Sequence, residues 1–169
     1  MGDNHMATYK INNKRKKYHD EAAYKSIETY VTREHTLPEE NIIGWGVDPD
    51  SAAEEMEVVA NAFGKNKGRR LVHEEINFDP EREGYITPDI ARRIVQEILP
   101  YFGEKYQQLA TIHEDRNHLH VHIMRSCVNF NDGSKYRGSR KDHYDYMKHL
   151  NKVGQRYGVK VIPVSKEED

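Results

Sequence analysis

Cysteine is nearly absent from this sequence: Cys127 is the only one among 169 residues. No disulfide can form within the chain, and a zinc site built from several thiolates is not expected. The sequence also lacks any apolar run that approaches the roughly 20 residues needed to span a bilayer. Its polar N-terminus has no hydrophobic stretch typical of a signal peptide. These absences predict a protein of the reducing cytoplasm, without membrane insertion.

Excess positive charge is missing as well. The net charge is −2 at pH 7 and the pI is about 6.6, values that are unusual for a protein that binds nucleic acid. Basic residues are nevertheless clustered at positions 14–17, 65–70 and 135–141. Such clusters are often solvated loops. Any attraction for DNA must therefore come from local patches rather than from the net charge.

A single domain is expected from the length and from a hydrophobic content of 36%. Residues 1–5 are interpreted as a cloning remnant, because Met6-Ala7-Thr8 reads as a natural start. No stretch of residues 6–169 has the composition of a linker between domains. The abrupt charged end at residues 167–169 favours a domain truncated from a longer protein.

The spacing of hydrophobic residues predicts an α+β fold. Ala23, Ile27, Tyr30 and Val31 recur at helical spacing, whereas residues 69–78 alternate as in a strand. We expect a mainly antiparallel sheet of about five strands with helices packed on it. The expected helices are 20–32, 51–63, 87–99 and 140–157, and the expected strands are 7–11, 69–78, 106–115, 118–129 and 159–164, with a short one around 42–43.

Alternating histidines are the most specific signal in the sequence. His118, His120 and His122 share one face of a strand, while the residues between them point into the core. A tight turn at residues 116–117 predicts a β-hairpin that brings His113 beside His120 and His122. Three imidazoles on two adjacent strands form one side of a divalent-metal site and leave positions open for substrate. The alternative is that these histidines merely line an exposed strand face.

Phosphodiester chemistry is a plausible use for such a site. The phosphate repels an approaching nucleophile, and a metal ion offsets its negative charge by polarising a phosphoryl oxygen. Asp115, which shares a strand face with His113, is placed to accept a ring N–H and to orient a ligand.

The pattern His113-x-Asp115-x-x-His118-x-His120-x-His122 resembles the third motif of the relaxase/mobilisation-nuclease family (MobA/VirD2-like), a histidine-hydrophobic-histidine class of endonuclease. The likeness extends downstream over residues 126–133 and 156–162, and upstream to Ile27-Glu-Thr-Tyr30-Val-Thr-Arg-Glu. It spans most of the chain, but only the histidine motif is highly specific. The resemblance implies a relaxase-like palm as the fold.

Individual roles follow from the resemblance. It implies that His113, His120 and His122 bind the metal, with Mg²⁺ or Mn²⁺ expected and Zn²⁺ as the alternative. Tyr30 would be the nucleophile, and Glu75 an acidic support near the metal. His118 stands at a position that is often histidine but not usually a ligand. Ser126 stands where the family usually has asparagine, which puts one polar contact in doubt.

The assignment of Tyr30 leaves alternatives open. Tyr30 falls on the apolar stripe of its helix, so ordinary core packing is a competing interpretation, and Tyr18 and Tyr24 lie nearby. A tyrosine of unperturbed pKa near 10 is a weak nucleophile at neutral pH. The metal-bound phosphate and a base, either His118 or Asp115, would have to assist it.

The resemblance also implies a reaction and its partners. The chain would nick single-stranded DNA at a transfer origin through a 5′-phosphotyrosyl intermediate and later rejoin it, for conjugative mobilisation. Accessory relaxosome proteins and a coupling protein are expected partners in the bacterial cytoplasm. Trp45 and Tyr136 are candidates for stacking on a base. The expected DNA-binding residues are Lys14, Arg15, Lys16, Lys17, Lys135, Tyr136, Arg137 and Arg140.

Three competing functions use the same residues. A rolling-circle replication initiator or a transposase of the same nuclease class would differ mainly in the DNA it serves. A histidine-triad nucleotide hydrolase would use His120 as nucleophile without metal, but its motif lies near the chain end, whereas some 47 residues follow His122 here. A non-catalytic DNA-binding module would hold a purely structural metal.

Overall fold

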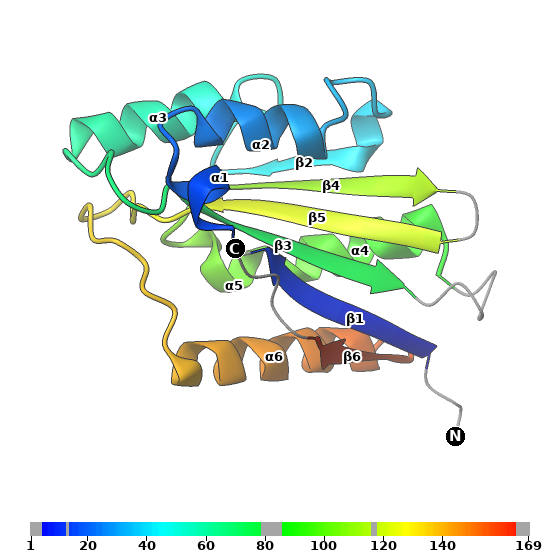
Figure 1. Ribbon diagram of the computed structural model, residues 1–169. Coiled ribbons are helices and arrows are strands. Elements are labelled where there is room, and N and C mark those ends of the chain that lie inside the picture. The colour runs from blue at the N-terminus through cyan, green and yellow to red at the C-terminus, as the bar shows by residue number, and fades with distance from the viewer. Residues whose placement is uncertain (1–4, 13, 79–85, 116–117, 165–169) are drawn as a thin grey trace.

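The fold is built on one six-stranded sheet of order β2-β4-β5-β3-β1-β6 (Figure 1). All neighbouring strands are antiparallel except β1 and β6, which are parallel. The computed structural model describes residues 5–12, 14–78, 86–115 and 118–164, with the backbone alone at positions 5 and 15. The strands are β1 (His5–Asn12), β2 (Ile42–Trp45), β3 (Leu71–Phe78), β4 (Gln108–Asp115), β5 (His118–Ser126) and β6 (Val159–Pro163).

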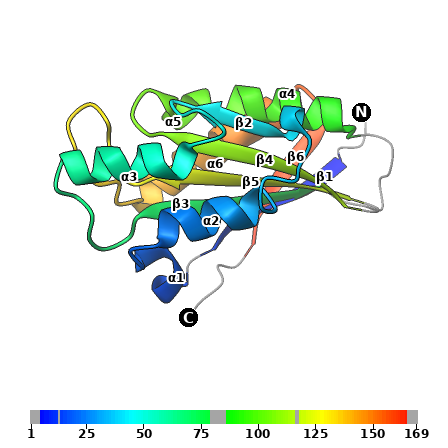
Figure 2. The same ribbon diagram turned by 90° about the horizontal axis from the view of Figure 1, so that it is seen from above.

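Helices lie on both sides of this sheet. Seen from above, α1, α2 and α3 lie on one side and α4, α5 and α6 on the other (Figure 2). Two helices begin at side-chain caps: Thr87 accepts from the backbone N–H of Ile90, and Ser139 forms a capping box with Asp142. The helices are α1 (Arg15–His19), α2 (Ala23–Val31), α3 (Ala52–Ala62), α4 (Pro88–Ile98), α5 (Pro100–Gly103) and α6 (Arg140–Gln155), with a 3-10 turn η1 at Glu39–Asn41.

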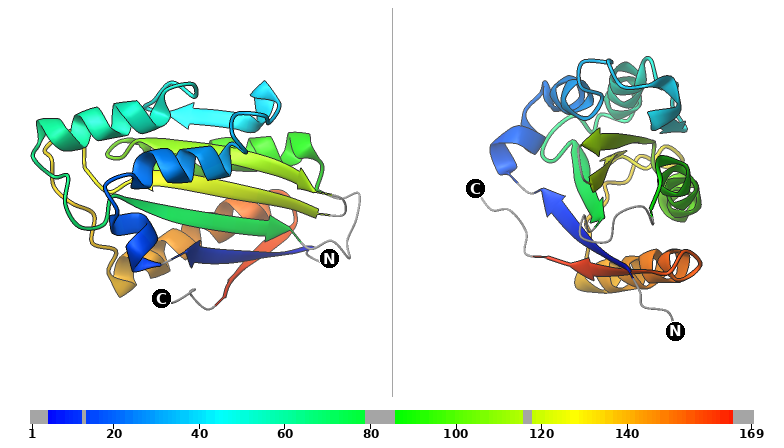
Figure 3. Two further views of the ribbon diagram at one scale, coloured as in Figure 1. Left: turned by 45° about the horizontal axis from the view of Figure 1, so that its top comes forward. Right: turned by 90° about the vertical axis from the view of Figure 1, so that its right-hand side faces the viewer.

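Strand alternation divides the core into two clusters, one on each face of the sheet. Val121, Ile123 and their neighbours on β3 pack against α4, α5 and α6. On the opposite face, Leu71, Leu109 and Met124 pack under α2 and α3. Further along β3, β4 and β5 this second face carries polar side chains instead. Figure 3 shows the two helical layers with the sheet between them.

The α+β prediction is confirmed, with six strands rather than about five. The sixth is the short edge strand β2, at the place where a short strand was expected around residues 42–43. The basic run expected as a loop contains helix α1 instead. His5, set aside with the first residues, pairs with Val159 in β1. The predicted turn at residues 116–117 lies outside the described residues, but the pairing of Asp115 with His118 confirms the hairpin register.

Within the part of the chain that the structure describes, no helix has the length and apolar character required to cross a membrane.

Candidate active site

The second face of the sheet gathers histidines from three adjacent strands. His113 on β4 pairs with His120 on β5, and His122 on β5 pairs with Glu75 on β3. These side chains share the face because pairing partners on neighbouring strands point the same way. The sheet therefore brings the predicted hairpin histidines to the same place as Glu75.

Burial keeps these imidazoles neutral. His113 and His122 are almost fully buried, and their ring centres are 4.3 Å apart. Burial lowers the pKa of His122 to about 2 and also lowers the pKa of His113 and of His120. Neutral imidazole is the form that binds a metal ion.

Hydrogen bonds fix which ring nitrogens are available. His113 Nε2 lies 2.7 Å from the Val31 carbonyl oxygen, so it donates there and Nδ1 keeps its lone pair. His120 Nδ1 faces the side-chain oxygen of Asn77, so Nδ1 donates and Nε2 keeps its lone pair. That Nε2 lies 3.5 Å from a carboxylate oxygen of Asp115. The Nε2 atom and the carboxylate oxygen are both acceptors, and a cation between them stabilises this arrangement.

His73 belongs to this cluster although the sequence did not single it out. Its Nε2 lies 2.8 Å from His122 Nδ1, and the two rings stack with centres 5.1 Å apart. On its other side, Nδ1 contacts the amide of Asn12 and the hydroxyl of Tyr18. Burial lowers the pKa of His73 to about 4. The available signal in the sequence was its position two residues before Glu75, on the same face of the predicted strand.

Tyr30 stands at the edge of this cluster. Its side chain is 52% exposed, so it is not the core residue that its place on the helical stripe allowed. The ring lies edge-on to His73 and His122, with centres 5.9 and 5.8 Å away. Lys17 Nζ lies 4.8 Å from the centre of the Tyr30 ring. Tyr24 and Tyr18 are buried, and burial raises the pKa of Tyr24 to about 12.

The two acidic residues of the face have basic partners. Arg33 donates to both carboxylate oxygens of Asp115 at 2.8 and 2.9 Å, which lowers the pKa of Asp115. Burial alone would raise the pKa of Glu75, but the hydrogen bond from Asn12 and the ammonium of Lys10 lower it overall. Glu75 Oε1 lies 3.6 Å from His122 Nε2.

The two residues considered as bases make no contact with the Tyr30 ring within the described part of the chain. His118 is at the far end of β5, edge-on to His120 with ring centres 4.3 Å apart, and its buried Nδ1 has no hydrogen-bond partner within the described part of the chain. Asp115 is held by Arg33. The groups that flank Tyr30 are His73, His122 and Lys17.

The donor chemistry of this cluster fits a divalent metal. Three neutral imidazoles with partners on their second nitrogens, beside two carboxylates, are a typical ligand environment. As the side chains stand, no three His, Cys, Asp or Glu residues converge on one point within residues 5–12, 14–78, 86–115 and 118–164. Ligation therefore requires ring reorientation, and His113, whose Nε2 is held by Val31, would have to use Nδ1.

The family model of the relaxase MobA/VirD2-like nuclease domain matches residues 30–159, from Tyr30 through the histidine hairpin to the first residue of β6. The chain belongs to this relaxase family.

Relatives and a solved structure agree with this assignment. Two proteins named "Protein rlx" from Staphylococcus aureus are 28% and 24% identical to the relaxase domain, over 73% and 70% of this chain. The chain spans 38% and 36% of their length. A solved structure described as "Molecular Basis of Vancomycin Resistance Transfer in Staphylococcus aureus" has a TM-score of 0.64 at 11% identity. It covers 96% of this chain and 99% of that one, and shows that the fold is shared.

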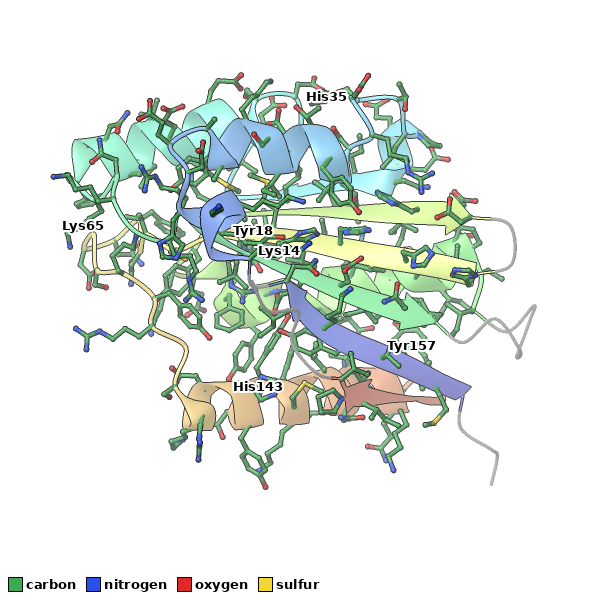
Figure 4. All side chains as sticks on the ribbon, viewed as in Figure 1. Lys14, Tyr18, His35, Lys65, His143 and Tyr157 are labelled. Atoms are coloured by element: carbon green, nitrogen blue, oxygen red, sulfur yellow. The ribbon has the colours of Figure 1, made fainter. Side chains whose placement is uncertain are left out.

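The expected DNA contacts of the relaxase domain divide into two groups. Lys14 and Lys17 line a hollow with Tyr30, and Lys16 beside them is exposed. Figure 4 shows Lys14 next to Tyr18 in front of the sheet. Arg15 lies in α1, with its side chain outside the described residues.

The second group does not reach the histidine face. Lys135 Nζ donates to the carbonyl oxygens of Lys67 and Arg69, so it ties two loops together. Tyr136 packs edge-on against Phe102 in the core of the opposite face, which leaves it no free ring face for a base at this site. Three further candidates lie elsewhere: Trp45 is packed against the Phe102 side of the core, Arg137 is exposed, and Arg140 begins α6.

Proposed function

We propose that this domain nicks single-stranded DNA by forming a covalent phosphotyrosine at Tyr30 and that it rejoins the strand by the reverse reaction. The observation that carries the proposal is the position of Tyr30, half-exposed and edge-on to His73 and His122. An exposed tyrosine beside neutral imidazoles that can hold a metal is the constellation that phosphoryl transfer to tyrosine requires.

The bond changes are simple. The Tyr30 Oη–phosphorus bond forms as the bond from phosphorus to the 3′-oxygen breaks. The phenolic proton is lost, and the leaving 3′-oxygen gains a proton to become a hydroxyl. One phosphodiester replaces another, so the reverse attack by the 3′-hydroxyl restores the strand without ATP.

Each part of the cluster has a role in this reaction. His113, His120 and His122 would hold a divalent cation, Mg²⁺ or Mn²⁺ with Zn²⁺ as the alternative. When bound, this cation would polarise a non-bridging oxygen of the scissile phosphate and offset its charge. Asn77 and Val31 orient two of the rings.

Lysines provide the electrostatic part of substrate binding. Lys14 and Lys17 line the hollow that holds Tyr30, together with Lys10. Their ammonium groups attract the phosphates on either side of the scissile bond, in spite of the net negative charge of the chain. The positive charge of this site is a local patch, as expected for a DNA-binding chain whose net charge is negative.

The relaxase family supports a proposal about the biological setting. We propose that the DNA is the transfer origin of a mobile element in the bacterial cytoplasm, and that accessory relaxosome proteins and a coupling protein assemble there. A replication initiator or a transposase would use the same site on other DNA.

The test is adduct formation on a single-stranded transfer-origin oligonucleotide with Mg²⁺ or Mn²⁺. We expect a covalent adduct with the wild type that EDTA abolishes and that Tyr30→Phe lacks. Tyr144→Phe is the matched control, because Tyr144 is an exposed tyrosine on α6. An adduct that survives in Tyr30→Phe moves the nucleophile to Tyr24 or Tyr18. Metal-independent hydrolysis of mononucleotide conjugates without any adduct would instead establish the histidine-triad chemistry.

A further inference from the structure

Two hollows lie on the histidine face and share one wall. The smaller, about 260 Å³, is lined by Tyr30, His73 and three lysines, Lys10 among them. The larger, about 540 Å³, is lined by Met6, Thr8, Asn77, Phe78, His118 and His120. Both are also lined by Lys10 and Glu75, which pair at 3.2 Å. The Lys10–Glu75 pair is therefore the boundary between a hollow that contains the nucleophile and one that does not.

The two hollows lie at opposite ends of the cluster along the strands. Tyr30 stands over His73 on β3, and the larger hollow reaches Asn77, four residues further on. Four residues of a strand span about 13 Å. Glu75 and its pairing partner His122 stand midway. A phosphate bound between the two ends thus has Tyr30 on one side and the larger hollow on the other.

Phosphoryl transfer places the attacking and leaving oxygens on opposite sides of phosphorus, roughly in line. If Tyr30 attacks from its end of the cluster, the 3′-oxygen must leave toward the other end. We propose that the larger hollow binds the nucleoside immediately 5′ to the nick, the one that keeps the 3′-hydroxyl. This assignment rests on the proposed nicking by Tyr30 and adds to it the direction in which the DNA strand crosses the sheet.

The lining of the larger hollow suits a nucleoside. Met6 offers apolar surface to a base, while Thr8 and His118 carry groups that can hydrogen-bond to its edge or to the sugar. A volume of about 540 Å³ is within the range of roughly 300–1,000 Å³ that is usual for small-ligand sites. The smaller hollow, rich in lysine, suits the phosphate on the 3′ side of the nick.

Lys10 gains a specific role from this arrangement. It belongs to both hollows, and its ammonium, paired with Glu75 at 3.2 Å, lies at their boundary, where the proposal places the scissile phosphate. Lys10 is thus a positioning residue that holds the phosphate between the nucleophile and the leaving nucleoside.

The test compares the two product halves of the transfer-origin strand. One oligonucleotide ends in the 3′-hydroxyl at the nick, and the other begins with the 5′-phosphate. Thr8→Trp fills the larger hollow from its β1 wall. We expect it to weaken binding of the 3′-hydroxyl half about tenfold or more and to change binding of the other half less than about twofold. Val58→Trp, at an exposed position on α3, is the control for the added tryptophan.

A second measurement requires no substitution in the protein. An abasic deoxyribose immediately 5′ to the nick should weaken binding to the wild type about fivefold or more, because it removes the base that the hollow holds. Thr8→Trp should bind the abasic strand as tightly as it binds the intact strand, because the tryptophan already excludes the base from the larger hollow.

Failure of the inference and of the proposed function are distinguishable. Adduct formation on the intact strand by the wild type, with equal effects of Thr8→Trp on both halves or a larger effect on the 5′-phosphate half, overturns the strand direction and leaves nicking established. Absence of a Tyr30-dependent adduct overturns the proposed function itself.

Discussion

At the scale of single residues, His73 decides which nitrogen His122 can offer to a metal. Their Nε2 and Nδ1 atoms lie 2.8 Å apart, and one proton is shared between them. For His122 to present the lone pair of Nε2, its Nδ1 must donate and His73 must accept. The hydroxyl of Tyr18, 3.0 Å from His73 Nδ1, can then accept the proton on that side, and the Asn12 amide, 3.2 Å from the same nitrogen, keeps only its hydrogen bond to Glu75. His73 is therefore a positioning residue for a predicted metal ligand.

We predict that His73→Ala lowers the affinity for Mn²⁺ about 10- to 100-fold, the usual effect of removing the partner of a ligating histidine. Isothermal titration calorimetry on the purified protein measures this directly. His149→Ala is the control, since His149 lies on α6 and contacts the carbonyl oxygen of Glu97. Unchanged affinity in His73→Ala, with binding lost in His122→Ala, would contradict the positioning role.

The residues of the site were predictable where the register was local. His113, His120 and His122 lie on two strands joined by a two-residue connection, so alternation alone determines which side chains meet. His73 is 49 positions from His122, and nothing in the sequence gives the register between β3 and β5. The exposure of Tyr30 also depends on packing, because its helical stripe is compatible with burial.

At the scale of elements, the turn after α2 is unusual. Arg33, Glu34 and His35 all have positive φ, at 52°, 57° and 62°. This left-handed conformation costs a residue other than glycine roughly 1–2 kcal/mol. Tertiary contacts offset the cost: Arg33 binds Asp115 at the end of β4, and His35 lies 3.2 Å from the buried carboxylate of Glu28. The turn thereby fastens the end of α2, which carries Tyr30, to the histidine hairpin.

We predict that Glu34→Gly leaves the free energy of unfolding unchanged or raises it by up to about 1 kcal/mol. Glycine adopts positive φ without steric cost. The free energy gained in this way equals or exceeds the entropic cost of the flexibility that glycine adds to the unfolded chain. Urea unfolding monitored by circular dichroism gives the comparison. Glu57→Gly, at an exposed position inside α3, should instead lower stability by about 1 kcal/mol. Equal losses in the two variants would show that the turn carries no strain.

The long elements were predictable and the short ones were not. Helices α4 and α6 follow from strong periodicity and from their caps at Thr87 and Ser139. Helix α1 has five residues, too few to be stable alone. It forms because Tyr18 is buried against His73, a tertiary contact that local sequence does not encode.

At the scale of the whole molecule, the sheet separates stability from chemistry. Glu74 and Glu75 are neighbours in the sequence, but alternation turns them to opposite faces. Glu74 is buried and accepts from Arg125 at 2.6 Å and from the hydroxyls of Tyr9 and Tyr146. The Arg125 guanidinium also lies 3.8 Å from the centre of the Phe102 ring. Glu75 faces the histidines and the two hollows.

This division predicts different effects for two adjacent substitutions. Glu74→Ala leaves the buried charge of Arg125 without its carboxylate, and we expect a loss of about 3–5 kcal/mol in the free energy of unfolding. Glu75→Ala breaks a partly exposed pair with Lys10, and we expect a loss of about 1 kcal/mol or less together with weaker Mn²⁺ binding. Urea unfolding and calorimetric Mn²⁺ titration of both variants test this. If Glu75→Ala destabilised the protein as much as Glu74→Ala and left Mn²⁺ affinity unchanged, the histidine face would be a second structural core. With the predicted result, the face opposite α4 and α6 holds its charged groups for substrate and metal, and the buried Arg125–Glu74 pair on the other face holds the sheet that positions them.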